Sequence, residues 1–133
     1  MYAIDWVMEN RIVISRPVGD QTKESVTNAI FTLKERIEAG TAPVHVISDL
    51  RYVGAFPTDL SMLVKMIERQ ANSGYTIVIG GTRLTHFFSR VLAQFGGGRS
   101  PEFFDNVADA LAWLQKVDAT LGDDLHYDEA PPA

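Results

Sequence analysis

Apolar and polar residues alternate over several short stretches of the chain, which is the pattern of β-strands. Residues 3–8 and 11–16 are rich in β-branched and aromatic residues and flank Glu9 and Asn10. Because asparagine tolerates a positive φ, this pair predicts a tight hairpin between two strands. Three further runs predict strands at residues 44–48, 75–79 and 102–104.

Between these strands, apolar residues recur at intervals of three and four, which predicts amphipathic helices. The first helix is expected at residues 23–38, with Thr22 as its N-cap and Gly40 as a left-handed C-cap. Its apolar stripe consists of Val26, Ile30, Leu33 and Ile37. Three more helices are expected to begin at Thr58 or Asp59, at Thr82 and at Asn106. In the last one, the inward-facing residues are expected to be Val107, Leu111, Leu114 and Leu121.

The resulting order is β-β-α-β-α-β-α-β-α, which predicts one α/β domain with a mixed, mostly parallel five-stranded sheet and crossover helices. We expect the domain at residues 1–121 and an acidic, disordered tail at residues 122–133. Within residues 44–49, Ser48 shares one face with valines, and His45 and Asp49 share the other with Ile47. This mixture predicts that helices crowd one face of the sheet and leave the other partly open.

Composition and charge narrow the possible functions. Of the 133 residues, 12 are Lys or Arg and 17 are Asp or Glu, so the net charge is −5. The tail contributes four of the acidic residues, which leaves a nearly neutral body without the basic surface that nucleic-acid binding needs. The chain has no apolar run long enough to span a membrane and no signal-peptide pattern, so we expect a cytoplasmic protein.

Cysteine is absent, which excludes disulfides, thiolate nucleophiles and cysteine metal sites. His45, His86 and His126 lack metal-ligand spacing, and no G-x-S-x-G motif is present. We therefore expect no metal, no cofactor and no enzymatic activity. The enzymatic alternative is a reaction that uses Asp49 with Arg51 or Arg83, and it requires a carboxylate with a raised pKa in a cleft.

The strongest candidate for a functional surface is the stretch at residues 44–64, where a strand ends, a loop follows and a helix begins. Open α/β sheets place their binding sites at such carboxyl ends of strands. We expect this interaction or switch surface to include Asp49, Arg51, Thr58, Asp59 and Ser61.

A second candidate is the stretch Gly80-Gly81-Thr82, whose backbone N–H groups end a strand and open a helix, as in anion sites. The following helix places a basic stripe beside an apolar one. The expected anion or ligand contacts are Thr82, Arg83, His86 and Arg90. The alternative is an ordinary solvated helix face.

Four segments carry a resemblance to a known family: WVMENRIVISRPVGDQT, HVISDLRYVGAFPTDLSMLV, YTIVIGGTRLTHFFSRVLAQF and PEFFDNVADALAWL. In element order they resemble the STAS domain (sulfate transporter and anti-sigma factor antagonist), and more closely the SpoIIAA-like proteins. The match covers residues 4 to about 114. The resemblance implies a protein-interaction or regulatory domain whose partner is another protein.

In anti-sigma factor antagonists of this family, Asp-Leu at a strand end is followed by Asp-Ser-Ser-Gly, and a kinase phosphorylates the second serine. Here Asp49-Leu50 matches the first dipeptide, but Pro57-Thr58-Asp59-Leu60 fills the place of the second motif. Asp59 stands where the target serine would be, so the phospho-switch serine is absent. Asp59 then acts either as a fixed negative charge at the helix N-terminus or simply as part of a good helix start.

SpoIIAA-like proteins are also similar in fold to the lipid-carrying domain of CRAL-TRIO proteins. That resemblance implies an alternative function, namely a carrier or sensor of a small lipophilic or anionic ligand in a pocket between the sheet and the helices. Such a function needs a cavity of several hundred Å³, since ligand pockets span about 300–1,000 Å³. We also expect self-association into a homodimer through an open sheet face or the hairpin edge strand.

Overall fold

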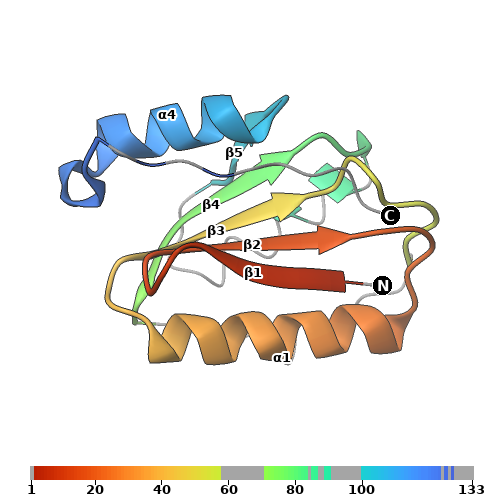
Figure 1. Cartoon of the computed structure of the whole chain (residues 1–133). Helices are drawn as coiled ribbons and strands as arrows, with labels where there is room; N and C mark the ends of the chain where they lie inside the picture. The colour runs from red at the N-terminus through yellow and green to blue at the C-terminus, as the bar shows by residue number, and fades with distance from the viewer. Residues whose placement is uncertain are drawn as a thin grey trace.

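The computed structural model describes residues 2–57, 71–83, 85, 86, 89, 90, 100–123, 125 and 127 (Figure 1). The helix expected from Thr58 or Asp59 lies outside these residues, as does much of the helix expected after Thr82. The described strands are β1 (Tyr2–Met8), β2 (Ile12–Pro17), β3 (Val44–Asp49), β4 (Ser73–Ile79) and β5 (Glu102–Phe104). The described helices are α1 (Lys23–Ala39), α4 (Val107–Val117) and the short 3-10 helix η1 (Ala119–Leu121).

The five strands form one mixed sheet in the order β1-β2-β3-β4-β5. β1 pairs antiparallel with β2, and every other pair is parallel. The hairpin between β1 and β2 turns at Asn10, whose φ of 65° confirms the predicted positive value. The predicted fold class, an α/β domain built on a mixed and mostly parallel sheet, is therefore confirmed.

The two faces of the sheet are covered by different helices, with α1 on one side and α4 on the other (Figure 1). Val13, Val44 and Val46 form one apolar cluster with Ile37 of α1. Residues of α4 and η1 form the second cluster with isoleucines of the strands: Ile12, Ile14, Ile47, Ile77 and Ile79. The expectation of a partly open face is therefore wrong in the middle of the sheet, because α4 follows the last strand and packs back on the face opposite α1.

Helix α1 begins as predicted and ends differently. The Thr22 hydroxyl accepts a hydrogen bond from the Ser25 amide, and the Ser25 hydroxyl accepts one from the Thr22 amide. The predicted left-handed cap at Gly40 is wrong, since its φ is −83°. Glycine is needed there for space, because a Cβ atom would lie 2.7 Å from the Asn10 carbonyl oxygen and 2.7 Å from Val44 Cγ2.

The C-terminal part of the chain packs onto the second face. Asn106 caps α4 as predicted, by accepting a hydrogen bond from the Asp109 amide. The predicted inward residues of this region, Val107, Leu111, Leu114 and Leu121, are all buried, although Leu121 belongs to η1. Beyond η1, Leu125 and Tyr127 are half-buried against the same cluster, so these two tail positions contact the core. No helix in the described part of the chain is both long and apolar enough to cross a bilayer.

Candidate functional site

The last residue of β3, Asp49, holds two arginines at the carboxyl end of the sheet. Its carboxylate accepts hydrogen bonds from Arg51 Nε at 2.9 Å, Arg51 Nη2 at 2.8 Å and Arg16 Nε at 3.2 Å. Burial alone would raise the pKa of Asp49, but the hydrogen bonds from Arg51 and the positive charges of both arginines outweigh it and hold the pKa below its usual value. The bond to Asp49 in turn raises the pKa of Arg51.

Asp49 and Arg51 differ in how far their side chains are buried, and this determines their roles. The side chain of Asp49 is 0% exposed, whereas that of Arg51 is 23% exposed. Asp49, which we expected on an interaction surface, therefore cannot touch a partner directly. It orients Arg51, which does reach solvent. A carboxylate with a lowered pKa also does not meet the condition that the enzymatic alternative requires.

The loop after β3 is fixed to the loop after β2. Four hydrogen bonds join residues 18–21 to residues 50–57, and we call these two segments together the two-loop platform. The backbone bonds run from the Gly19 amide to Tyr52, from the Gly54 amide to Gly19 and from the Gln21 amide to Ala55, at 2.8–3.0 Å. The Asp20 carboxylate accepts the fourth from the Ala55 amide at 2.7 Å.

Close packing between the two loops explains part of their sequence. A Cβ atom on Gly54 would lie 2.3 Å from Asp20 Oδ1 and 3.2 Å from both the Asp20 amide nitrogen and the Gly19 carbonyl carbon, so glycine favours this close approach of the loops. The sequence pattern predicted that the loop after β3 belongs to a functional surface, but it did not predict that this loop is hydrogen-bonded to residues 18–21. Gly19, Asp20 and Gly54 are the signal that was available, since Gly and Asp are typical of such turns.

The second predicted cluster follows β4. Gly80 and Gly81 have positive φ values of 66° and 97°. The amide of Thr82 donates to the Thr85 hydroxyl at 2.8 Å, so one of the N–H groups expected to hold an anion is already engaged. His86 Nε2 donates to the Gly80 carbonyl oxygen at 2.6 Å, which places the histidine beside the strand end.

The two arginines of this cluster are exposed. Arg90 stacks on the Phe103 ring, with its guanidinium carbon 5.1 Å from the ring centroid. Arg83 lies exposed just after Thr82. The remaining predicted residues of the interaction surface, Thr58, Asp59 and Ser61, lie outside the described residues.

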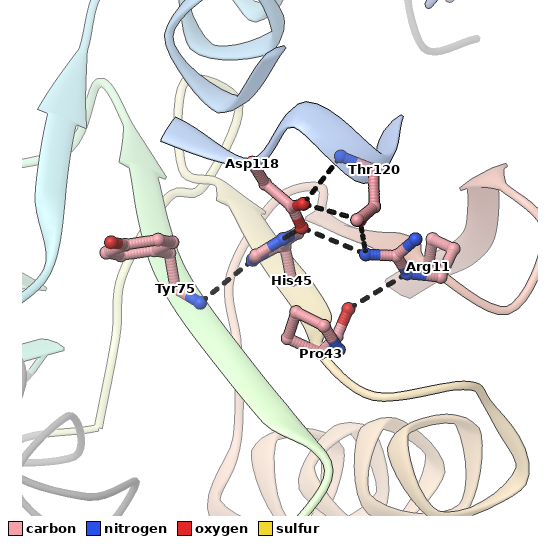
Figure 2. Close-up of polar contacts among 6 residues, drawn as sticks. All are labelled: Arg11, Pro43, His45, Tyr75, Asp118 and Thr120. Atoms are coloured by element: carbon pink, nitrogen blue, oxygen red, sulfur yellow. Dashed lines mark hydrogen bonds and ion pairs between the residues drawn. The ribbon is translucent and has the colours of Figure 1, made fainter. Parts of the chain in front are cut away.

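A third cluster, at the amino ends of the strands, was not predicted (Figure 2). His45 Nε2 lies 2.8 Å from Asp118 Oδ2, and His45 Nδ1 accepts a hydrogen bond from the Tyr75 amide at 3.0 Å. Because Nδ1 accepts, the hydrogen-bond pattern requires a neutral ring that carries its proton on Nε2 and donates it to Asp118. Both ring nitrogens of this buried histidine are therefore engaged.

Asp118 connects this histidine to the start of β2. Arg11 Nη2 donates to Asp118 Oδ2 at 2.9 Å and to the Thr120 hydroxyl at 2.8 Å. Burial alone would raise the pKa of Asp118, but hydrogen bonds from Thr120 and His45 and the charge of Arg11 lower it to about 2. The cluster thus joins the C-terminal end of α4 to the sheet and acts as a structural clamp.

The likeness of this chain to known proteins is visible in structure rather than in sequence. No model of a known protein family matches the sequence, and none of the curated proteins matches it significantly. Solved structures do match. An uncharacterized protein of the DUF3478 family with a SpoIIAA-like fold, from Shewanella loihica PV-4, is 21% identical, with a TM-score of 0.56 over 86% of this chain and 92% of that chain.

The anti-sigma factor antagonist SpoIIAA, in its unphosphorylated form, also matches. It is 19% identical, with a TM-score of 0.60 over 86% of this chain and 98% of that chain. Both likenesses extend over nearly the whole of the matched chains, so this chain has a SpoIIAA-like fold, as the element order predicted. At these identities the likeness concerns the fold alone.

Proposed function

We propose that this chain is a non-enzymatic regulatory domain that binds another protein through the two-loop platform. The observation that carries the proposal is the rigid attachment of residues 50–57 to residues 18–21 by four hydrogen bonds. A surface that is already ordered loses little conformational entropy on binding, which favours recognition of a partner of complementary shape. Arg51, held from below by Asp49, supplies a positively charged group of fixed position on this surface.

The fold supports a regulatory role by analogy. One protein of the same fold is an anti-sigma factor antagonist, and the matched structure is that of its unphosphorylated form. The resemblance of the sequence to this family implies that Asp59 takes the place of the phosphorylated serine, so the proposal includes binding that is independent of phosphorylation. Incubation with a kinase of the host should then leave Thr58 and Ser61 without phosphate, as measured by mass spectrometry.

The engagement of the titratable groups supports a non-enzymatic function without a cofactor. Asp49 and Asp118 both have lowered pKa values, and both nitrogens of His45 have hydrogen-bond partners. General acid-base catalysis needs a group whose pKa lies near the working pH and which can reach the substrate. We also propose that the protein is located in the cytoplasm.

Ala55 offers a sharp test, because it is exposed on the platform and only its backbone holds the loop. Ala55→Arg adds bulk to the surface without removing a hydrogen bond. Ala119→Arg is the matched control, since Ala119 is exposed at the opposite end of the sheet. Native mass spectrometry of each tagged protein, purified from its own host, should show a protein partner with the wild type and Ala119→Arg that is lost with Ala55→Arg. Equal retention by both variants would contradict the proposal.

The alternative function, a carrier of a lipophilic molecule, finds little room in the described part of the chain. The cavity beneath the platform, between α1 and the sheet, has a volume of about 80 Å³. This is well below the range of about 300–1,000 Å³ that is typical of ligand pockets. A depression of about 430 Å³ beside Ile4 and Thr32 is an open surface groove between β1 and α1.

We also propose that the chain binds a second copy of itself. β1 is the edge strand of the sheet and pairs only with β2 among the described strands. Its outer backbone groups have no strand partner in the described part of the chain, which favours pairing with a second copy. Size-exclusion chromatography with light scattering would distinguish a dimer from a monomer.

A further inference from the structure

The cavity of about 80 Å³ beneath the two-loop platform has a polar floor and apolar walls. Its floor is formed by the ends of β2 and β3, and one of its walls by α1. Leu50 and Phe56 of the platform close it on another side. Small-molecule sites also combine a few polar groups with apolar side chains, although their usual volume of about 300–1,000 Å³ exceeds that of this cavity.

Two serine hydroxyls lie side by side on the floor. Ser15 of β2 and Ser48 of β3 are directly paired in the parallel register, so their side chains point to the same face. Neighbouring strands lie about 4.8 Å apart, which is close enough for one ligand oxygen to contact both hydroxyls. Ser15 is only 3% exposed and lines the cavity. Within the described part of the chain, neither hydroxyl donates to or accepts from another protein group.

Two further hydroxyls line the cavity and have defined partners. Thr85 donates to the Thr82 carbonyl oxygen at 3.0 Å, and Ser89 donates to the Thr85 carbonyl oxygen at 2.8 Å. Each of these two hydroxyl groups already donates its proton, but the Ser89 hydroxyl oxygen can still accept a hydrogen bond. The cavity thus offers donors at Ser15 and Ser48 and an acceptor at Ser89.

Charge and size limit the ligand. Among the described residues that line the cavity, none is charged. The described part of the lining therefore offers an ionised ligand no counter-charge, which favours a neutral ligand. A cavity of about 150 Å³ holds a benzene molecule, so about 80 Å³ holds roughly three or four non-hydrogen atoms.

We propose that this cavity is a binding site for a small neutral molecule with one hydroxyl or carbonyl group on a short aliphatic body. The ligand oxygen accepts hydrogen bonds from Ser15 and Ser48, and its aliphatic part contacts Ala29, Ile30 and Leu33 of α1. A hydroxyl ligand also donates to Ser89. The site is separate from the exposed surface of the platform and does not depend on the proposed partner.

The probe is 2-propanol, titrated into the full chain labelled with 15N and followed by NMR. The amide signals of Ser15, Ser48 and Ala29 should shift in a saturable way with a dissociation constant in the millimolar range, as expected for so few atoms. The double variant Ser15→Ala/Ser48→Ala should bind at least about fivefold more weakly, which is the loss expected for one hydrogen bond. Ala29→Val, which narrows the cavity, should abolish the saturable shifts.

Two controls make the result decisive. Thr41→Ala removes an exposed hydroxyl at the opposite end of β3 and should bind 2-propanol like the wild type. The double serine variant should melt at or above the wild-type temperature, because the two removed hydroxyls have no protein partner within the described part of the chain. Shifts that stay linear with concentration, or saturable shifts that persist unchanged in the double variant, would overturn the proposal. Because Ala55→Arg leaves the cavity lining intact, loss of partner binding in that variant and loss of 2-propanol binding are separate results.

Discussion

Arg51 binds both carboxylate oxygens of Asp49, at 2.9 Å from Nε to Oδ1 and at 2.8 Å from Nη2 to Oδ2. Asp49, which the sequence suggested as a functional residue, is therefore buried and orients Arg51, which reaches solvent. The same carboxylate also binds Arg16 of β2, so one charge fixes the ends of two neighbouring strands and the start of the loop between β3 and the following segment. The ion pairs of Asp49 with Arg51 and Arg16 thus help to hold the two-loop platform in place.

Replacing Asp49 with asparagine should therefore destabilise the fold strongly. The substitution removes the negative charge that pairs with Arg16, which is 8% exposed, and with Arg51. Breaking a buried pair in this way costs about 3–5 kcal/mol. Urea unfolding followed by circular dichroism would measure the loss. Asp5→Asn, at an exposed position of β1, should change the stability by less than about 0.5 kcal/mol.

The clamp at Asp118 should make stability depend on acid pH. The pKa of Asp118 falls from 3.8 to about 2 on folding, so its contribution is fully present above the unfolded value and is lost as the pH falls through the folded value. The contribution amounts to about 1–2 kcal/mol after allowance for solvent screening. Unfolding curves for Asp118→Asn should lie below those of the wild type at pH 7 and converge with them near pH 2. A constant difference across this range would contradict the clamp. Asp123→Asn, at an exposed position beyond η1, controls for the loss of one negative charge.

His45 should be neutral and carry its proton on Nε2. The Tyr75 amide donates to Nδ1 at 3.0 Å, and Nε2 lies 2.8 Å from the Asp118 carboxylate. Long-range 1H–15N correlation spectra distinguish the two tautomers directly. The Nε2 signal should be that of a protonated nitrogen and the Nδ1 signal that of an acceptor. The opposite tautomer would require the Tyr75 amide to lose its partner.

Much of this fold was predictable from the sequence because its information is local. Alternating strands, the positive φ at Asn10 and the caps at Thr22 and Asn106 each depend on residues within one element or turn. The order of elements then restricts the topology, because parallel crossovers have a preferred hand. This hand does not apply to α4, which leads to no further strand among the described residues, so the sequence did not predict which face of the sheet α4 covers.

The contacts of the sites were less predictable because they join distant parts of the chain. His45 and Asp118 are 73 residues apart, and Asp20 and Ala55 are 35 residues apart. No periodic pattern links such pairs. The sequence did place Arg51 and its loop at the carboxyl end of a central strand, but whether Asp49 was exposed or buried depended on Arg16 of the neighbouring strand.

Two glycines should respond differently to substitution, because they are required for different reasons. At Gly40 the backbone is ordinary, but a Cβ atom would lie 2.7 Å from both the Asn10 carbonyl oxygen and Val44 Cγ2. Gly40→Ala should therefore cost about 1–3 kcal/mol through steric overlap. At Gly19 nothing lies within 4 Å, and only the φ of 78° opposes a side chain. Gly19→Asn should cost less, because asparagine tolerates positive φ. Thermal unfolding of the two variants would compare them, and a Gly40→Ala variant as stable as the wild type would contradict the close packing.

Leu125 and Tyr127, which lie within the tail that we expected to be disordered, should contribute to stability. Leu125 and Tyr127 are half-buried against the cluster formed by α4 and the sheet, and the guanidinium carbon of Arg16 lies 5.8 Å from the centre of the Tyr127 ring. The double variant Leu125→Ala/Tyr127→Ala should lower the free energy of unfolding by about 2 kcal/mol, because two half-buried side chains lose their contacts. Asp123→Ala, in the same segment but exposed, should lower it by less than about 0.5 kcal/mol. Equal stability of the two variants in urea unfolding would mean that this segment does not stay on the core. A difference would instead make the C-terminal segment part of the structure that covers Arg16, and so part of what holds the Asp49 ion pair away from water.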